Sequence, residues 1–285
     1  MLDENFYVEA NKQTNGYFIP GNECNDPNSI CISNDNLKKL TGQKDIPKNP
    51  DAIKKIIDQL KSKSNCKSQS CVLERNNLEA VDNNGKQLMM KPKGPANSNE
   101  WLDNFNIELT FDNLERIFPN FHYFKCELRD FMSAGSRNDE NDIHNIYKYS
   151  PYPTDKLNCF AIILNTALTG SPGEHWVSLF YDFRNRPWEI NFFDSANQNY
   201  NKILPIIKQS IAVIEHNGVK EGIEHDVIVK FNVVGHQRGG SECGVYSLFF
   251  CCARLFGYSF DEFNKSDQIF KDDEIEKLRK SLFIS

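Results

Sequence analysis

Residues 237–246 read Gln-Arg-Gly-Gly-Ser-Glu-Cys-Gly-Val-Tyr, and an apolar run that ends at Leu255 follows directly. The Gly/Ser-rich part predicts a loop, and the apolar run predicts a buried helix that begins at Cys243. Unpaired backbone N–H groups and the helix dipole at such an N-terminus favour a thiolate over a thiol. Cys243 is therefore the candidate nucleophile. Cys251 and Cys252 lie inside the same predicted helix with no loop to expose them, so we assign both to the core.

Two predicted strands upstream carry the groups that a nucleophilic cysteine needs. Residues 176–181 and 188–193 are rich in aromatic and β-branched residues, and residues 185–187 between them are turn-forming. An antiparallel pair would bring His175, just before the first strand, beside Asp194, just after the second. His175 is therefore the candidate base, and Asp194 is the candidate residue that orients it.

Each of these assignments has an alternative, and for Cys243 it is an ordinary buried cysteine. His236 lies closer to Cys243 in sequence, but triad members meet in space, so we favour His175 and interpret His236 as a loop residue. Asp194 and Ser195 could instead form a simple turn, which is a common role for an Asp-Ser pair.

Composition restricts the class of protein. The 285 residues, 39% hydrophobic and 12% aromatic, can form one large globular domain or two small ones. A net charge of −6 argues against a general affinity for nucleic acid, although a local basic patch remains open around Lys54, Lys55 and residues 61–67. No apolar run approaches the roughly 20 residues that cross a bilayer, and the N-terminus lacks a signal-peptide core. We therefore expect a soluble protein that is not secreted.

The nine cysteines of such a protein are expected to be reduced thiols. Cys66 and Cys71 have a spacing at the edge of that found in zinc fingers, but no second Cys/His pair follows nearby. We therefore predict no disulfide, no metal site and no cofactor.

Residues 1–94 differ from the rest of the chain because they are rich in Asn, Lys, Asp and Ser and poor in aromatics. Asn49 and Pro50 mark the start of a helix whose apolar residues recur at helical spacing. Pro and Gly residues within 91–98 then indicate a linker. We therefore predict a helical N-terminal arm over residues 1–94 and a core domain over residues 95–285.

The core domain is predicted to have an α+β fold. Residues 159–164 and 226–234 are strand candidates that join the two strands above. Apolar residues at helical spacing predict further helices around residues 111–118, 203–214 and 275–282. Helices that flank a mostly antiparallel sheet, without alternating regularly with its strands, are typical of this class.

The order of these motifs resembles a known group of proteins. His-Trp at 175–176, Asp-Ser at 194–195 and Gln237, followed six positions later by Cys243, resemble the catalytic set of the ubiquitin-like-protein protease and adenain group of cysteine proteases. Trp101 begins a Trp-Leu-Asp-Asn stretch similar to the Trp-Leu-Asn-Asp motif of that group, with Asp and Asn exchanged. The matched elements cover about the last two thirds of the chain.

The resemblance implies a papain-like-inverted α+β core in which Cys243, His175 and Asp194 form a catalytic triad. It also implies that Gln237 donates its side-chain N–H to the oxyanion, beside the backbone N–H of Cys243. Losing one such donor typically costs about 10²-fold to 10³-fold in rate. A solvated loop glutamine is the alternative for Gln237.

Trp101 and Trp176 are implied to wall a narrow channel that admits only glycine beside the scissile bond. Both tryptophans could instead be ordinary core aromatics. A side chain on the substrate residues in such a channel would clash with the indole rings, and glycine alone has none.

A narrower resemblance is to the polyprotein-processing proteases of large DNA viruses, of the African swine fever virus type. It includes the helical arm and rests on residues 66–73, 93–95, 103–107, 173–177 and 236–244. One departure is Asp194, where the viral type carries asparagine. Either side chain can accept the imidazole N–H, so the mechanism is not threatened.

The narrower resemblance implies a cysteine endopeptidase that cuts viral structural polyproteins after Gly-Gly-Xaa sites, in the host cytoplasm and the virion. A protease that removes SUMO- or ubiquitin-like modifiers after their terminal Gly-Gly, in the cytoplasm or nucleus of a cell, is the second hypothesis. The third is an inactive module that binds ubiquitin-like folds, against which the intact Cys243, His175, Asp194 and Gln237 argue. All three imply a protein partner and no membrane.

Overall fold

The structure, a computed structural model, describes residues 6, 10, 13, 32, 34–67, 69–76, 78, 94–96, 99–132, 150–198, 200–222 and 224–283. The chain forms two compact units. Unit 1 consists of residues 1–119 together with residues 273–285, and unit 2 consists of residues 120–272. The predicted boundary between an arm and a core domain at residues 94–95 stays a prediction.

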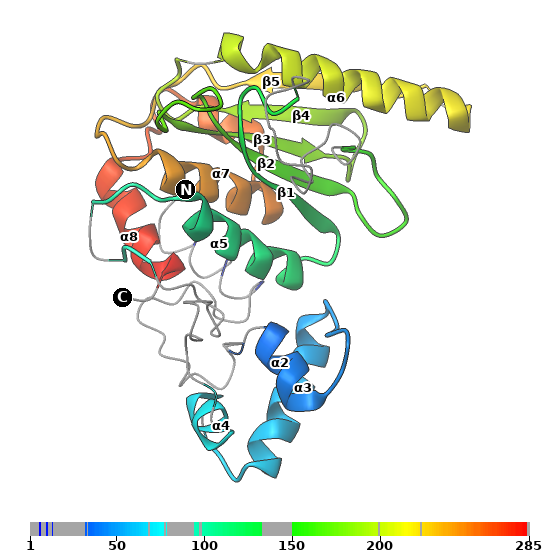
Figure 1. Cartoon of the computed structure of the whole chain (residues 1–285). Helices are drawn as coiled ribbons and strands as arrows, with labels where there is room; N and C mark the ends of the chain where they lie inside the picture. Colours follow the sequence, from blue (N-terminus) through cyan, green and yellow to red (C-terminus); the bar gives the residue numbers. More distant parts are fainter. Residues whose placement is uncertain are drawn as a thin grey trace. The chain divides into compact units, whose positions relative to one another are not determined.

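The described elements of unit 1 are helices (Figure 1). They are α2 (Asn34–Thr41), α3 (Pro50–Lys63), α4 (Gln69–Arg75), α5 (Asn104–Ile117) and α8 (Asp272–Leu282), whose first residue belongs to unit 2. The helix predicted to start at Asn49 and Pro50 is confirmed as α3, because the Asn49 side chain accepts hydrogen bonds from the backbone N–H groups of Asp51 and Ala52. In α8, the buried Arg279 donates a 2.9 Å hydrogen bond to the carbonyl oxygen of Glu100.

Cys66 and Cys71 form a disulfide, so the prediction of reduced thiols is wrong for this pair. The short connection between α3 and α4 places their Cα atoms 5.6 Å apart, within the range that a disulfide spans. The close spacing of these two cysteines therefore closes a small loop between helices. The other five described cysteines are not part of a disulfide: Cys126, Cys159, Cys243, Cys251 and Cys252.

A five-stranded sheet lies at the centre of unit 2 (Figure 1). Its strands, in spatial order, are β1 (Phe121–Leu128), β2 (Cys159–Asn165), β3 (Trp176–Asp182), β4 (Trp188–Phe193) and β5 (Val227–Phe231). The α+β class is confirmed, and all four predicted strands form. The fifth, β1, continues the apolar residues at the end of α5, so periodicity alone does not separate the two elements.

The sheet is mixed, whereas the sequence predicts a mostly antiparallel one. The central pairs β2–β3 and β3–β4 are antiparallel, but β1 pairs with β2 and β5 pairs with β4 in parallel. Ser178 of β3 lies opposite Phe193 of β4, so the start of β3 and the end of β4 meet at one edge of the sheet. Because β5 is parallel to β4, the end of β5 lies at the same edge.

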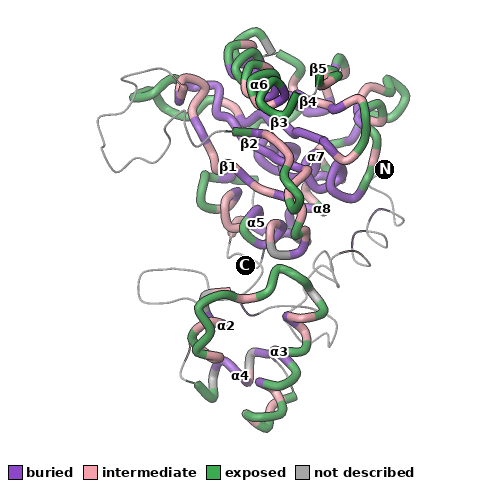
Figure 2. Tube along the Cα trace, turned by 90° about the vertical axis from the view of Figure 1, so that its right-hand side faces the viewer, coloured by how far each residue is buried: buried purple, intermediate pink, exposed green. Residues whose placement is uncertain are grey.

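Two helices cover opposite faces of the sheet: α6 (Tyr200–Glu221) and α7 (Cys243–Leu255) (Figure 1). Leu179 of β3 and Ile190 of β4 belong to one apolar cluster with the isoleucines of α6. On the other face, the ring of Phe193 stacks on that of Phe250 in α7, with 4.8 Å between the centroids. Strands β2 to β4 and helix α7 are consequently almost entirely buried (Figure 2), which explains their continuous apolar sequences.

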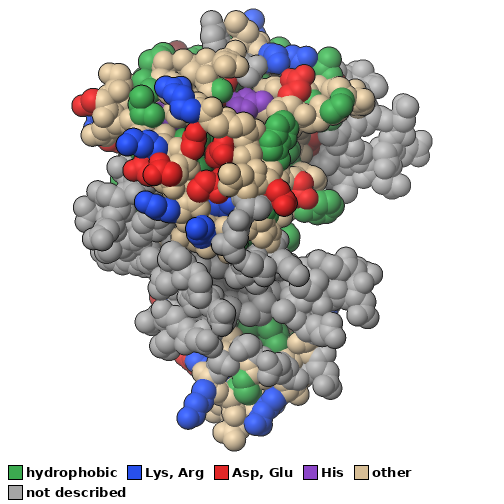
Figure 3. Space-filling model, turned by 90° about the vertical axis from the view of Figure 1, so that its left-hand side faces the viewer, with side chains coloured by type: hydrophobic (Ala, Val, Ile, Leu, Met, Phe, Trp, Pro, Cys, Tyr) green, Lys and Arg blue, Asp and Glu red, His purple; other side chains and the backbone are tan. Residues whose placement is uncertain are grey.

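The surface carries charges of both signs. On the face shown in Figure 3, Asp and Glu side chains lie interspersed with Lys and Arg side chains. Within the described ranges, no helix has the length and apolar character needed to cross a membrane.

Candidate active site

The predicted site residues of unit 2 lie near one end of the sheet. At this end β3 begins and β4 ends. His175 directly precedes β3, and its carbonyl oxygen accepts a 2.9 Å hydrogen bond from the backbone N–H of Thr166. Asp194 directly follows β4. The antiparallel register therefore places the two side chains together, as the sequence predicts.

Asp194 and His175 form a short hydrogen bond. The Nε2 atom of His175 lies 2.7 Å from Oδ1 of Asp194, whose side chain is only 1% exposed. The carboxylate also accepts from the backbone N–H groups of Ala196, at 2.9 Å to Oδ1, and Gln198, at 2.7 Å to Oδ2. Burial raises the pKa of Asp194, but the bond to His175, the charge of His175 and these backbone donors outweigh burial and lower it. Asp194 is therefore a carboxylate that holds the His175 ring.

Cys243 is the first residue of α7, at the helix N-terminus that the sequence predicts. Burial lowers the pKa of His175, but hydrogen bonds to Asp194 and Cys243 and the charges of both groups raise it to about 9. His175 and Cys243 therefore interact at the N-terminus of α7.

Cys251 and Cys252 are core residues, as the sequence predicts; Cys243 is also buried, at 2% exposed, and differs from them by its place at the N-terminus of α7 and its interaction with His175. Cys251 and Cys252 are 0% exposed, and burial raises the pKa of both thiols. They remain protonated core residues at neutral pH.

Hydrogen bonds and ion pairs connect the C-terminal end of α7 to the sheet. Arg184 donates hydrogen bonds to the carbonyl oxygens of Arg254, at 2.7 Å, and Leu255, at 3.2 Å. The buried guanidinium of Arg254 in turn contacts Asp182 at 2.8 Å and Glu189 at 3.1 Å. Cations at the C-terminal end of a helix satisfy its unpaired carbonyl groups. These bonds fix the position of the helix that carries the candidate nucleophile.

Gln237 lies in the loop before α7 and is held at both ends of its amide. Its Oε1 accepts a 2.7 Å hydrogen bond from the hydroxyl of Ser195, and its Nε2 donates a 2.9 Å hydrogen bond to the carbonyl oxygen of Gly239. Gln237 is 9% exposed, so it is not a solvated loop residue. Its amide nitrogen carries a second hydrogen that can be donated to an oxyanion.

Asp272 shapes the same loop. Its carboxylate accepts from the backbone N–H groups of Arg238, at 3.1 Å, and Gly239, at 2.7 Å, and from the hydroxyl of Tyr246 in α7, at 2.9 Å. A Cβ atom at position 239 would lie 2.5 Å from the carboxylate of Glu242, so a larger residue there would require that carboxylate to move. These contacts bind the loop to the first turns of α7.

Asn232, directly after β5, anchors the backbone of Asp194. Its Oδ1 accepts from the backbone N–H of Asp194 and its Nδ2 donates to the Asp194 carbonyl oxygen, both at 2.8 Å. Asn232 is 4% exposed. The sequence does not predict this role of Asn232, although its position near the end of a predicted strand is a signal for it.

His236 is structural. Its ring is 0% exposed, its Nε2 donates to the carbonyl oxygen of Phe263 at 3.0 Å, and its Nδ1 accepts from the backbone N–H of Phe270 at 3.3 Å. Both ring nitrogens are therefore occupied away from Cys243. His236 lies beside Gln237 as predicted, but it is buried.

The two predicted channel residues lie in different units. Trp176 opens β3 directly after His175 and is 9% exposed. Trp101 precedes α5 in unit 1 and is 52% exposed, and its place beside the cysteine stays a prediction.

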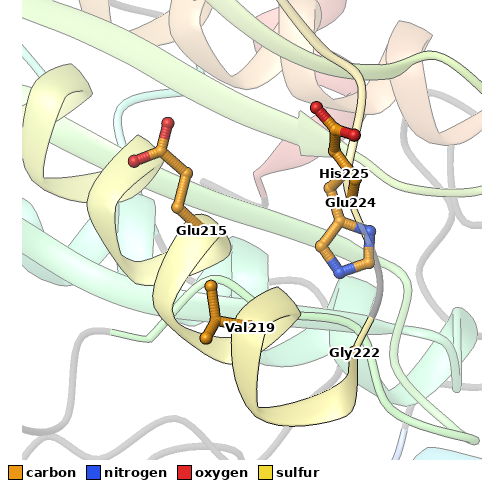
Figure 4. A pocket seen from close by; sticks show the side chains of 5 residues that line it. All are labelled: Glu215, Val219, Gly222, Glu224 and His225. Atoms are coloured by element: carbon orange, nitrogen blue, oxygen red, sulfur yellow. The ribbon is translucent and has the colours of Figure 1, made fainter.

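A pocket of about 370 Å³ lies elsewhere in unit 2, between the end of α6 and the start of β5 (Figure 4). Its lining includes Glu215 and His225. The ring of His225 stacks on Trp188, the first residue of β4, at 4.0 Å. Since Asp194 follows the other end of β4, the pocket and the candidate active site lie about 20 Å apart along the strand.

Known proteins share this architecture. Residues 124–285 match the family model described as the Ulp1 protease family, C-terminal catalytic domain. A cysteine protease of African swine fever virus is 29% identical over 243 residues, which cover 79% of this chain and 85% of that protein. A protein of another isolate, 29% identical over the same shares, is named SUMO-1 cysteine protease. The crystal structure of the selenomethionine form of the African swine fever virus protease has a similar fold over 96% of this chain and 98% of that chain, with a TM-score of 0.61 and 22% identity.

Proposed function

Because the chain belongs to the Ulp1 protease family, and is therefore a cysteine protease, we propose that Cys243, His175 and Asp194 form its catalytic triad. The observation that carries this proposal is the 2.7 Å hydrogen bond from His175 to the buried Asp194 carboxylate, because Cys243 also acts on the same imidazole and helps to raise its pKa. Gln237 is the proposed oxyanion donor together with the backbone N–H of Cys243.

In the proposed reaction, the Cys243 thiolate attacks the scissile carbonyl carbon, and the carbonyl electron pair moves to oxygen. The oxyanion is stabilised by Gln237 and the helix N-terminus. The carbonyl re-forms as the C–N bond breaks, and the His175 imidazolium gives its proton to the leaving amine. Neutral His175 then takes a proton from water, whose oxygen attacks the thioester and releases the Cys243 thiolate.

The proposed substrates are proteins with glycine at the cleavage site. The family supports this proposal, and Trp176, next to His175 in sequence and 9% exposed, supports a wall at that position. With Trp101 as the opposite wall, the channel would exclude any residue with a side chain. We favour cleavage of viral structural polyproteins after Gly-Gly-Xaa in the host cytoplasm and the virion, because the relatives are viral proteases.

Removal of a SUMO- or ubiquitin-like modifier is the second candidate function. The name of the SUMO-1 cysteine protease relative is the observation that favours it. Both functions use the same triad and differ only in the protein that presents the glycines.

One experiment separates these functions from an inactive binding module. The full-length chain is incubated with a polyprotein segment that contains a Gly-Gly-Xaa site and, separately, with a SUMO precursor, and products are identified by mass spectrometry. We expect cleavage of the polyprotein directly after Gly-Gly-Xaa, and none by Cys243→Ala. Cleavage of the SUMO precursor alone would favour deconjugation. If neither is cut and a thiol-directed activity probe leaves Cys243 unlabelled, the protease mechanism is wrong.

A further inference from the structure

Ser195 makes three contacts with the loop that carries Gln237. Its hydroxyl donates to Oε1 of Gln237 at 2.7 Å. Its carbonyl oxygen accepts from the backbone N–H groups of His236, at 2.7 Å, and Gln237, at 3.0 Å. Ser195 is 1% exposed, so water does not replace these bonds readily. One residue therefore holds both the backbone and the side chain of Gln237.

A glutamine amide can adopt two orientations that exchange its oxygen and its nitrogen, and its two partners together set its position and orientation. In the observed orientation, Oε1 faces the Ser195 hydroxyl and Nε2 faces the carbonyl oxygen of Gly239. The exchanged orientation would bring two acceptor oxygens together at Gly239. In the observed orientation Nε2 donates one hydrogen to Gly239, and its second hydrogen can be donated to an oxyanion.

The neighbouring residue Asp194 positions the proposed base, His175. Its side chain orients His175, and its backbone is anchored on both sides by Asn232. The Asp-Ser pair therefore ties the orientation of the base to that of the oxyanion donor. A turn-forming role alone would not require the Ser195 hydroxyl to point at Gln237.

We propose that Ser195 is a positioning residue that fixes the Gln237 amide for oxyanion stabilisation. The proposal rests on the proposed function, in which Gln237 is the oxyanion donor. Ser195 then acts on the chemical step through Gln237 and contributes nothing to the formation of the thiolate.

A double-mutant cycle tests this proposal. S195A, Q237A and the double variant are compared with wild type on a Gly-Gly peptide. We expect S195A to lower kcat about tenfold with KM within about twofold, and Q237A to lower kcat about 10²-fold to 10³-fold. Because Ser195 acts through Gln237, the double variant should equal Q237A. S195T, which keeps the hydroxyl, should recover kcat to within about threefold of wild type.

Two controls separate positioning from general damage. The rate of Cys243 alkylation by iodoacetamide, followed by mass spectrometry, should be the same in S195A and wild type. S210A removes another buried hydroxyl, which bonds Tyr181 and the Ile206 carbonyl oxygen, and it should leave kcat unchanged. If S195A does not fold, the nearly isosteric S195C, a weaker donor, takes its place in the cycle.

The outcomes are distinct. Wild-type kcat in S195A, or losses that multiply in the double variant, would overturn the role of Ser195 alone. A slower alkylation of Cys243 in S195A would also overturn it, because the defect would then lie in the thiolate. A wild-type protein that leaves the peptide intact would overturn the proposed function, and the role of Ser195 with it.

Discussion

Replacing Asp194 by alanine or by asparagine separates the charge of this side chain from its hydrogen bonds. Alanine removes the acceptor of three part-buried hydrogen bonds, those from His175, Ala196 and Gln198. A hydrogen bond to a charged group typically contributes about 1.5–3 kcal/mol. An asparagine whose Oδ1 faces His175 keeps the bonds from His175 and Ala196. Only its Nδ2 group then faces another donor, the backbone N–H of Gln198. The exchanged orientation would oppose two donors, so asparagine should still hold the imidazole tautomer.

Both substitutions remove the charge that acts on His175. The pKa of His175 is about 9, compared with 6.5 for an ordinary histidine. Burial lowers this pKa, and the bonds to and charges of Asp194 and Cys243 raise it. The difference corresponds to roughly 3 kcal/mol in favour of the imidazolium. Because the folded-state pKa is raised, the imidazolium and its stabilising effect are fully present below pH 6.5 and are lost as the pH rises through about 9.

The assay is the pH dependence of kcat/KM for a Gly-Gly peptide, together with the alkylation rate of Cys243, from about pH 6 to about pH 10. In both variants the alkaline limb of the profile should move to lower pH by at least about one unit. The reason is that the pKa of His175 falls when the negative charge beside it is removed. At neutral pH, D194N should lose roughly tenfold in kcat/KM and D194A about 10³-fold. D58A, which removes an exposed carboxylate in α3, should leave the profile unchanged. Equal losses in D194A and D194N, with the limb still near pH 9, would show that Asp194 has only a structural role.

Cys243→Ser should abolish peptide cleavage, whereas Cys251→Ser should leave it nearly intact. The reason is that Cys251 is a fully buried thiol, and burial raises its pKa. Cleavage by Cys243→Ser at a rate near that of wild type would refute the mechanism. Replacing either substrate glycine by alanine should lower kcat/KM at least tenfold, or roughly 1.4 kcal/mol, and Trp176→Ala should lower the overall rate yet relax this discrimination. The measurement is kcat/KM for matched Gly-Gly, Ala-Gly and Gly-Ala peptides with both enzymes. Equal cleavage of all three peptides by wild type would mean that there is no glycine channel. Asn232→Ala should lower kcat by about 10-fold to 10²-fold, because the backbone of Asp194 loses both anchors. Steady-state kinetics and the thermal midpoint check this, and an unchanged kcat would refute it.

Much of the candidate site could be predicted because its residues stand at the ends of strongly marked elements. The Gly/Ser loop and the apolar run after it place Cys243 at a helix N-terminus, and two aromatic strands place His175 and Asp194 at adjacent ends. Such features depend on neighbouring residues and on periodicity, which are visible in a single sequence. The assignment of His175 over His236 also followed from strand pairing, and the structure buries His236 among backbone partners.

By itself, the sequence determined the α+β class, four of the five strands and the order of the site residues along the chain. Only the tertiary structure decided the mixed strand directions, the Cys66–Cys71 disulfide and the residues that support the site. Asn232 meets Asp194 across 38 residues, and Ser195 meets Gln237 across 42. These contacts depend on which strands pair and in which direction, and a hydrogen bond needs its two atoms within about 3 Å. Local composition carries no information at that distance along the chain, so these supporting residues become visible only once the sheet has formed.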